Sequence, residues 1–140
     1  AAPPAMRPYS CSRFSVPSAW DTWASVTRNQ TALSYLKVEE LRVRYIGPGD
    51  DDRQAATIMA NHPVPADVPL YYFEVEVVSK GREGFIGIGF QQDDVALHRL
   101  PGWEAHSYGY HGDDGHCFAG NGRGMPYGPR YTSGDVVGAL

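Results

Sequence analysis

The chain has 140 residues, a length typical of one domain that can bury a hydrophobic core. Only 20% of the residues are charged, whereas 16 are glycine, 11 are proline and 12% are aromatic, a composition that favours an all-β domain over a helical one. The net charge of −4 and the lack of a Lys/Arg cluster argue against a nucleic-acid ligand, and no apolar run is long enough to cross a membrane.

The start of the chain differs in composition from the rest. We expect residues 1–30 to form a proline-rich arm and an edge segment, and residues 31–140 to form the domain. Prolines within residues 1–8 block regular strand pairing, so this stretch is either a linker or an arm that lies on a neighbour. Trp20 and Trp23 follow, and we expect them to pack in the core or at the domain edge and not to contact a ligand.

The two cysteines, Cys11 and Cys117, are too few and too far apart for a disulfide framework or a four-thiolate zinc site. We expect two reduced, unpaired thiols, with a single disulfide as the alternative. Neither thiol has a sequence neighbourhood that indicates activation, because Cys117 lies in a predicted strand and Cys11 lies in the arm.

Short strands are predicted over residues 31–37 and 40–45, followed by a turn with an acidic tip at residues 46–53. Another strand is predicted over residues 55–60. It leads into residues 61–69, where three prolines fix the backbone and remove amide donors. A stiff loop of this kind loses little entropy on binding, which makes it a candidate for recognition.

The most regular stretch covers residues 71–90 and is predicted to be a β-hairpin. Apolar side chains at odd positions 71–77 alternate with Tyr72, Glu74 and Glu76 at even positions, as in a strand buried on one face. Polar residues 79–83, ended by a glycine, supply the turn. The return strand carries Gly87 and Gly89 on one face, which indicates that another backbone or a bulky ring lies close to that face.

Alternation stops after residue 90, so residues 91–103 are predicted to be a long loop. Short strands are then expected at residues 107–110 and 116–118, joined by a tight turn. Residues 120–129 are predicted to be a further loop. The last predicted strand begins at Asp135.

Six spaced motifs occur in the second half of the chain: Tyr71–Val75, Gly84–Gly89, Leu100–Trp103, His106–Gly115, Pro126–Pro129 and Thr132–Gly138. In this order they resemble the SPRY domain, and most of all the branch found in RanBPM-type proteins, the scaffold subunits of the CTLH (GID) ubiquitin ligase. The resemblance covers roughly residues 33–140. It implies an all-β fold, an antiparallel β-sandwich of the SPRY/B30.2 type with a concanavalin-like jelly-roll arrangement.

The sequence departs from this family after its last predicted strand, because a SPRY sandwich has several further strands at that point. We therefore expect the domain to be incomplete at its C-terminus and the chain to be the N-terminal portion of a longer polypeptide. The alternative is that a neighbour completes the sheet by strand addition.

Catalytic and metal sites have weak support in the sequence. His106, His111 and His116 lie with two aspartates near one turn, which suggests either a zinc or acid–base site or ordinary hairpin chemistry. In the resembling family this string is structural, so we expect no metal, no cofactor and no enzyme. Residues 50–52 do not match a calcium loop, residues 120–124 lack the context of a phosphate loop, and no Gly-x-Ser-x-Gly elbow is present.

The resemblance implies that loops at one end of the sandwich bind a partner protein or a short peptide. The implied partner-binding residues are Asn61, His62, Pro63, Val64, Pro65, Leu100, Trp103 and Tyr110. Trp103 has an alternative role, as a plug of the sandwich end, and Tyr108 is expected to face inward and to be structural. The family name does not imply Ran binding, because nothing in these residues indicates a GTPase site.

Two hypotheses about function follow. In the first, the chain is a non-enzymatic protein-interaction module within a larger scaffold or ubiquitin-ligase-type protein, with no nucleic-acid or membrane partner. In the second, it is a structural subunit built permanently into a large assembly, such as a cytoskeletal or ciliary complex. Either hypothesis predicts a cytoplasmic, nuclear or cytoskeletal location within a multi-protein complex.

Overall fold

The computed structural model describes residues 16–22 and 30–140. The elements with defined bounds in these residues are α2 (Gln30–Ser34), β1 (Leu36–Glu39), β2 (Arg42–Tyr45), the 3-10 helix η2 (Asp52–Gln54), β3 (Phe73–Glu76), β4 (Gly87–Gln91), β5 (Ser107–His111), β6 (His116–Ala119), β7 (Met125–Pro126) and β8 (Val136–Ala139). Strands dominate this list, so the expected all-β class is confirmed. The residue ranges 1–15 and 23–29 lie outside the described residues, and with them Cys11, Trp23 and most of the predicted arm.

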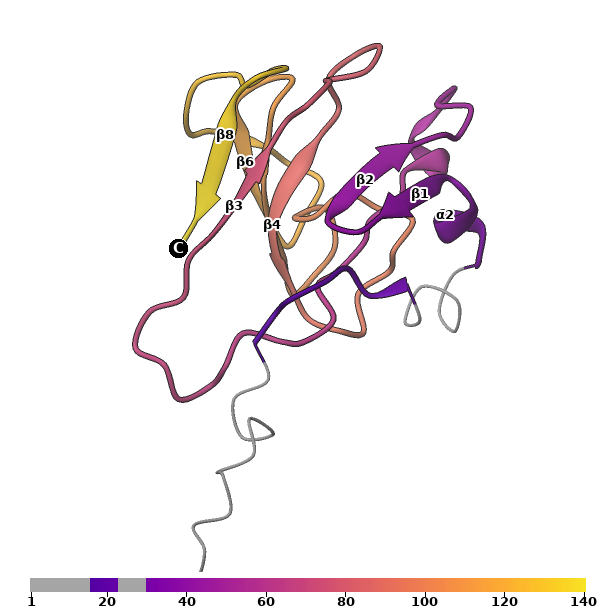
Figure 1. Cartoon of the computed structure of the whole chain (residues 1–140). Coiled ribbons are helices and arrows are strands. Elements are labelled where there is room, and N and C mark those ends of the chain that lie inside the picture. Colours follow the sequence, from indigo (N-terminus) through magenta and orange to yellow (C-terminus); the bar gives the residue numbers. More distant parts are fainter. Residues whose placement is uncertain (1–15, 23–29) are drawn as a thin grey trace, which may run out of the picture.

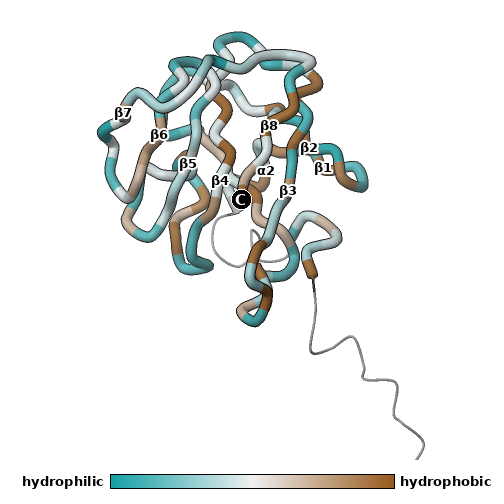
Figure 2. The backbone as a smooth tube through the Cα atoms, turned by 90° about the vertical axis from the view of Figure 1, so that its left-hand side faces the viewer, coloured by the Kyte–Doolittle hydropathy of each residue, from teal (hydrophilic) through white to brown (hydrophobic). Residues whose placement is uncertain are grey.

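The strands form antiparallel sheets (Figure 1). β1 pairs with β2, β3 pairs with β8, and β4, β5, β6 and β7 form a sheet in that order. Figure 2 shows β7, β6, β5 and β4 in succession, with β8 and β3 beyond β4.

Residues 71–90 do not form the predicted hairpin. β3 pairs with β8 and β4 pairs with β5, so the two strands belong to different sheets. The segment between them follows the β8 end of the chain instead: the Val77 amide donates to the Asp135 carbonyl at 2.9 Å, and the Lys80 amide donates to the Ser133 hydroxyl at 2.8 Å. Alternation predicts which face of a strand is buried but does not identify its partner, and this is why the pairing was wrong.

The inner face of β3–β8 packs on β4 and β5. Val77, Ile88, Tyr131 and Val137 form a buried hydrophobic cluster, and residues from both sheets pack against it. The rings of Phe73 and Phe90 meet edge to face, with their centroids 5.2 Å apart. Two antiparallel sheets are therefore stacked around one core, which confirms the β-sandwich.

The two glycines of β4 lie where another chain segment approaches, as the sequence predicts. A Cβ atom on Gly89 would lie 1.9 Å from the carbonyl oxygen of Tyr108, and one on Gly87 would lie 3.0 Å from the His111 ring. No side chain fits at Gly89 without displacing β5.

Two further predictions about strands are wrong. Within residues 31–37, the first part belongs to α2 and the strand begins only at Leu36. Within residues 55–60, only Ala60 makes a β-bridge, to Trp20. The amide of Thr57 donates to the carbonyl oxygen of Leu97 at 2.7 Å, so this segment is held by a loop and not by a neighbouring strand.

Candidate functional site

The first group of predicted binding residues, 61–65, begins at an anchored residue. The side-chain oxygen of Asn61 accepts hydrogen bonds from the amides of Ser18 and Ala19 at 3.0 and 3.3 Å, and its side-chain nitrogen donates to the Ser18 hydroxyl at 3.1 Å. The Asn61 amide also donates to the Ala19 carbonyl at 2.9 Å. Asn61 therefore fixes the edge segment to the base of the loop, a structural role that sequence reasoning missed.

The remaining residues of this group project from that base. Pro63 and Val64 are exposed, and His62 and Pro65 are half-buried. Val64 retains 41% of its surface. The loop enters β3 from below in Figure 1, so it lies at the end of the sandwich that also carries the edge segment. The prolines and the Asn61 hydrogen bonds fix the backbone of this loop, so its exposed apolar surface is ordered before any partner binds.

The edge segment is itself held in place on both sides. Asp21 donates its amide to the Met59 carbonyl at 2.7 Å, next to the Trp20–Ala60 bridge. The indole nitrogen of Trp20 donates to the Leu41 carbonyl at 2.8 Å. Trp20 thus packs at the domain edge, as predicted.

The second group centres on Trp103, which is half-buried on the long loop between β4 and β5. The Arg99 guanidinium lies 4.6 Å from the centre of the indole ring, and it also forms an ion pair with Glu104 at 2.9 Å. The indole also contacts the His111 ring in a tilted arrangement, with the centroids 6.0 Å apart. Leu100 is half-buried, and its carbonyl accepts the Trp103 amide at 3.2 Å.

His111 is the most deeply buried ionisable group beneath this loop, with 2% of its surface exposed. Its Nε2 lies 2.8 Å from the Pro101 carbonyl oxygen, and its ring stacks on Phe118 at a centroid distance of 4.1 Å. Burial lowers the pKa of the imidazole, since the charged form is poorly solvated there. A neutral imidazole that carries its proton on Nε2 can donate to the Pro101 carbonyl. His111 therefore helps to hold the loop on the sheet.

Tyr110 is placed in the hydrophobic core. Its hydroxyl donates to the Pro129 carbonyl, and its ring meets those of Tyr127 and Tyr131 at centroid distances of 5.1 and 5.0 Å. Tyr108 lies two residues earlier on the same face of β5 but is 60% exposed. The expectation that Tyr108 is an inward, structural side chain is corrected in this respect: it shares the inner face, but β3–β8 covers only the Tyr110 end of the strand.

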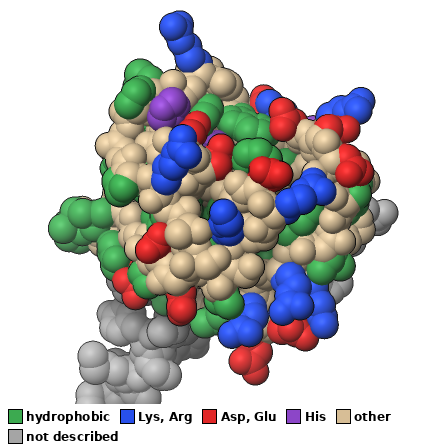
Figure 3. Space-filling model, turned by 90° about the horizontal axis from the view of Figure 1, so that it is seen from above, with side chains coloured by type: hydrophobic (Ala, Val, Ile, Leu, Met, Phe, Trp, Pro, Cys, Tyr) green, Lys and Arg blue, Asp and Glu red, His purple; other side chains and the backbone are tan. Residues whose placement is uncertain are grey.

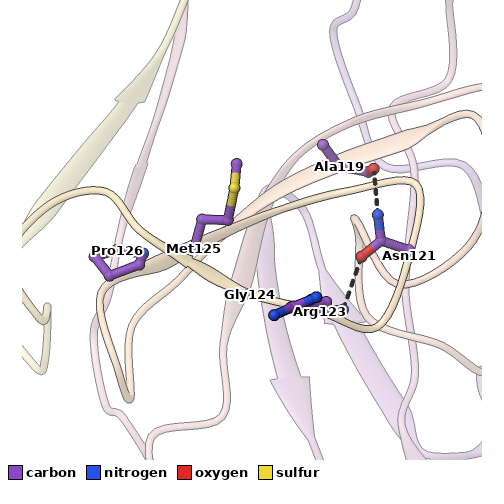
Figure 4. Close-up of a pocket in the computed structure, with 6 residues that line it drawn as sticks. All are labelled: Ala119, Asn121, Arg123, Gly124, Met125 and Pro126. Carbon is purple, nitrogen blue, oxygen red and sulfur yellow. Dashed lines mark hydrogen bonds between the residues drawn. The ribbon is translucent and has the colours of Figure 1, made fainter.

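A hollow of about 430 Å³ lies at the turn between β6 and β7 (Figure 4). Asn121 organises it: the side-chain nitrogen donates to the Ala119 carbonyl at 3.2 Å, and the side-chain oxygen accepts the Arg123 amide at 2.9 Å. The remaining lining residues are Gly124, Met125 and Pro126. The sequence predicted a loop here and excluded a phosphate loop, and the Asn-Gly turn chemistry was the signal of local order.

Of the histidines and aspartates near the β5–β6 turn, Asp114 and His116 approach each other, with His116 Nδ1 3.4 Å from the Asp114 carboxylate. Asp114 caps the turn, because its carboxylate accepts the His116 amide at 2.9 Å. His106 is exposed and has a positive φ of 63° at the end of the long loop, while His116 lies half-buried on β6. Within residues 16–22 and 30–140, no three His, Cys, Asp or Glu side chains are placed to hold a metal.

Charged side chains of both signs are interspersed on the end of the molecule shown in Figure 3. This face therefore lacks the continuous basic stripe with which proteins follow a phosphate backbone. In the part of the chain that the structure describes, no helix is both long enough and apolar enough to span a membrane.

Comparison with known proteins gives consistent matches. A sequence model of the SPRY domain matches residues 70–140. Ran-binding protein 10 of Danio rerio is 55% identical over 103 residues, which are 74% of this chain and 17% of that protein. Ran-binding protein 9 of Homo sapiens is 55% identical over 108 residues, 76% of this chain and 15% of that protein.

Similarity extends to a plant protein and to a solved structure. Ran-binding protein M homolog of Arabidopsis thaliana is 41% identical over 100 residues, 71% of this chain and 21% of that protein. A crystal structure of a human SPRY domain is 39% identical, with 48% of this chain and 42% of that chain covered and a TM-score of 0.47. The chain thus spans 15 to 21% of the length of these three curated relatives.

Proposed function

Because the chain belongs to the SPRY domain family, we propose that it is a non-enzymatic module that binds a partner protein or a short peptide through loops at one end of the sandwich. The observation that carries this proposal is the exposed Pro63–Val64 surface on a loop whose base is fixed by the Asn61 hydrogen bonds. A loop that is already ordered loses little conformational entropy when a partner binds.

Trp103 provides a second anchor for the partner. Arg99 and His111 both contact its indole, and the half-buried ring keeps part of its surface open. Large aromatic side chains fixed in this way are frequent centres of binding energy in interfaces.

The two groups share one framework. Thr57 lies four residues before Asn61, and it donates its amide to Leu97 at 2.7 Å and its hydroxyl to the Arg99 carbonyl at 2.6 Å. These bonds tie the segment that leads into the first group to the segment that precedes Leu100. The partner-binding role of all eight predicted residues remains a prediction, with Pro63, Val64 and Trp103 as the contacts that we favour.

We further propose that the module belongs to a larger scaffold protein of the ubiquitin-ligase type and works in the cytoplasm. The similarity to Ran-binding proteins 9 and 10 supports the larger protein in this proposal, since these relatives are several times longer than the chain. In such a scaffold the module would present a bound partner and would perform no chemistry itself.

The test is affinity capture with the full native polypeptide, in parallel with its Val64→Asp and Trp103→Ala variants. We expect both variants to lose the same partner while keeping the wild-type melting temperature to within a few degrees. Leu41→Ala is the matched control, because Leu41 is 70% exposed on a different turn. An unchanged set of partners in both variants contradicts the proposal, and a fixed-stoichiometry assembly unaffected by them identifies a structural subunit instead.

A further inference from the structure

The outer surface of the β3–β8 pair has no assigned role. Alternation along β3 turns Phe73, Val75 and Val77 toward the core and leaves the intervening side chains on the opposite face. We define the outer β3–β8 face by Tyr72, Glu74, Glu76, Val78, Val136 and Gly138. It lies on the side of the molecule that faces the viewer in Figure 2.

Three large apolar side chains are exposed on this face. Tyr72 is 56% exposed, Val78 is 59% exposed and Val136 is 58% exposed. The register places Glu76 opposite Val136 and Glu74 opposite Gly138. Because Gly138 has no side chain, the Tyr72 ring lies over it, and a Cβ atom there would be 2.4 Å from the tyrosine hydroxyl. No side chain projects from Gly138, so this part of the face remains accessible.

No cation within residues 16–22 and 30–140 forms an ion pair with the two carboxylates at the centre of this face. The Tyr72 hydroxyl donates to Glu74 at 3.0 Å, a neutral contact that leaves the negative charge in place. The ion pairs found within residues 16–22 and 30–140 involve other acidic residues, namely Glu39, Asp51, Glu104 and Asp114. Glu74 and Glu76 project from the same face of one strand, so their like charges also repel each other.

From Tyr72, just before β3, to Val78, two residues after it, the outer row reads apolar, acidic, acidic, apolar. Alternate residues of a strand are roughly 6.6 Å apart, which sets the spacing between the two carboxylates. A partner that complements this row presents two cations at that spacing with apolar side chains on either side. Anionic lipid and nucleic acid are disfavoured because they carry the same sign of charge as the row.

We propose that the outer β3–β8 face binds a partner-protein segment that presents two Lys or Arg side chains between apolar ones. This is a second surface, separate from the loop site of the proposed function, so either can fail without the other. Pairing of each carboxylate with a cation removes the repulsion between Glu74 and Glu76, while Tyr72, Val78 and Val136 bury apolar area.

The probe is a fluorescein-labelled extended peptide with Leu, Lys, Lys and Val at alternate positions and serine between them. Fluorescence anisotropy with the full chain measures its affinity, and a peptide with Glu in place of both Lys is the control ligand. We expect the Lys peptide to bind at least about tenfold more tightly than the Glu peptide, with the difference shrinking as salt is added.

Variants of the chain then locate the contact. The double variant Glu74→Gln with Glu76→Gln is expected to bind the Lys peptide about tenfold more weakly than the wild-type chain. Val136→Ser is expected to lower the affinity by a smaller factor. Glu39→Gln with Glu83→Gln removes the same net charge elsewhere and is expected to leave the affinity unchanged, as is Val64→Asp in the loop site.

Three results would overturn the proposal. If both double variants lose the same amount of affinity for the Lys peptide, the effect is only a long-range effect of charge. If the wild-type chain binds the Lys and Glu peptides equally well, the face does not select cations. Self-association of the wild-type chain that Glu74→Gln with Glu76→Gln abolishes in sedimentation equilibrium also overturns it, because the occupant is then a second copy.

Discussion

The two faces of the β4–β7 sheet are built in different ways. On the outer face, Ser107, Gly109 and His111 are buried beneath the long loop that carries Pro101 and Gly102. On the inner face, Tyr110 is packed into the core, but Tyr108 is 60% exposed and Met125 is 59% exposed. A loop therefore buries one face of this sheet more completely than the opposing strands bury the other.

The difference shows that burial in this domain is decided by the length and path of the connections. The Ser107 hydroxyl accepts the Gly102 amide at 2.9 Å and donates to the Glu104 carbonyl at 2.6 Å, so the loop is bonded to the strand it covers. By contrast, the inner face is covered at its Tyr110 end by packed side chains and by the hydroxyl hydrogen bonds of Tyr110 and Tyr131, whereas Tyr108 and Met125 stay exposed.

The largest expected effect comes from a change under the loop. Gly109→Val introduces a Cβ atom 2.0 Å from the Pro101 carbonyl oxygen, so the loop must move away from the sheet. We expect the free energy of unfolding to fall by about 3 kcal/mol or more in urea denaturation. Tyr108→Val, on the open face, should change it by no more than about 0.5 kcal/mol. Equal effects at the two positions would show that the faces do not differ.

A smaller effect is expected in the covered part of the inner face. The Tyr131 hydroxyl lies 2.8 Å from the Ile86 carbonyl oxygen and 2.7 Å from that of Tyr110, so its single proton serves both acceptors. Tyr131→Phe leaves these buried oxygens without that donor, and we expect a loss of about 1 to 2 kcal/mol. Tyr127→Phe is the control, since Tyr127 is 70% exposed. A Tyr131→Phe variant as stable as the control contradicts this assignment.

The smallest effect is a dependence of stability on pH, which reports on the loop-covered face. Burial lowers the pKa of His111 below its ordinary value of 6.5, so the unfolded chain binds a proton more readily than the folded one. The contribution of His111 is therefore complete above about pH 6.5 and declines as the pH falls below it.

Urea denaturation between pH 7.5 and 5.5 measures this decline. We expect His111→Gln to flatten the profile and the exposed His106→Gln to leave its slope unchanged. A profile that keeps its full slope in His111→Gln assigns the dependence to another group.

The sequence was informative wherever structure depends on neighbours in the chain. The strands at residues 107–110 and 116–118 were predicted because the short segments flank a tight Asp-Asp-Gly turn, and the close approach at Gly89 followed from glycine in a strand. The pairing of β3 with β8 joins segments about sixty residues apart in sequence, and no local pattern encodes such a partner.

The candidate site shows the same limit. The prolines of residues 61–69 predicted a stiff loop, and the structure places Pro63 and Val64 of that loop at the surface. The attachment of Asn61 to Ser18 spans 43 residues, and the Arg99 contact with Trp103 arises within an irregular loop where spacing has no fixed meaning. Sequence reasoning could name the loops but not the contacts that fix them.

The most direct test of the central claim is hydrogen exchange of the full native polypeptide, with and without the partner that the capture experiment identifies. Binding through the loops predicts slower exchange at Asn61, His62 and Val64 and around Leu100 to Trp103, with little change in β5 and β6. Protection confined to other parts of the chain, or no protection at all in a saturated complex, would contradict the assignment of these loops as the binding site.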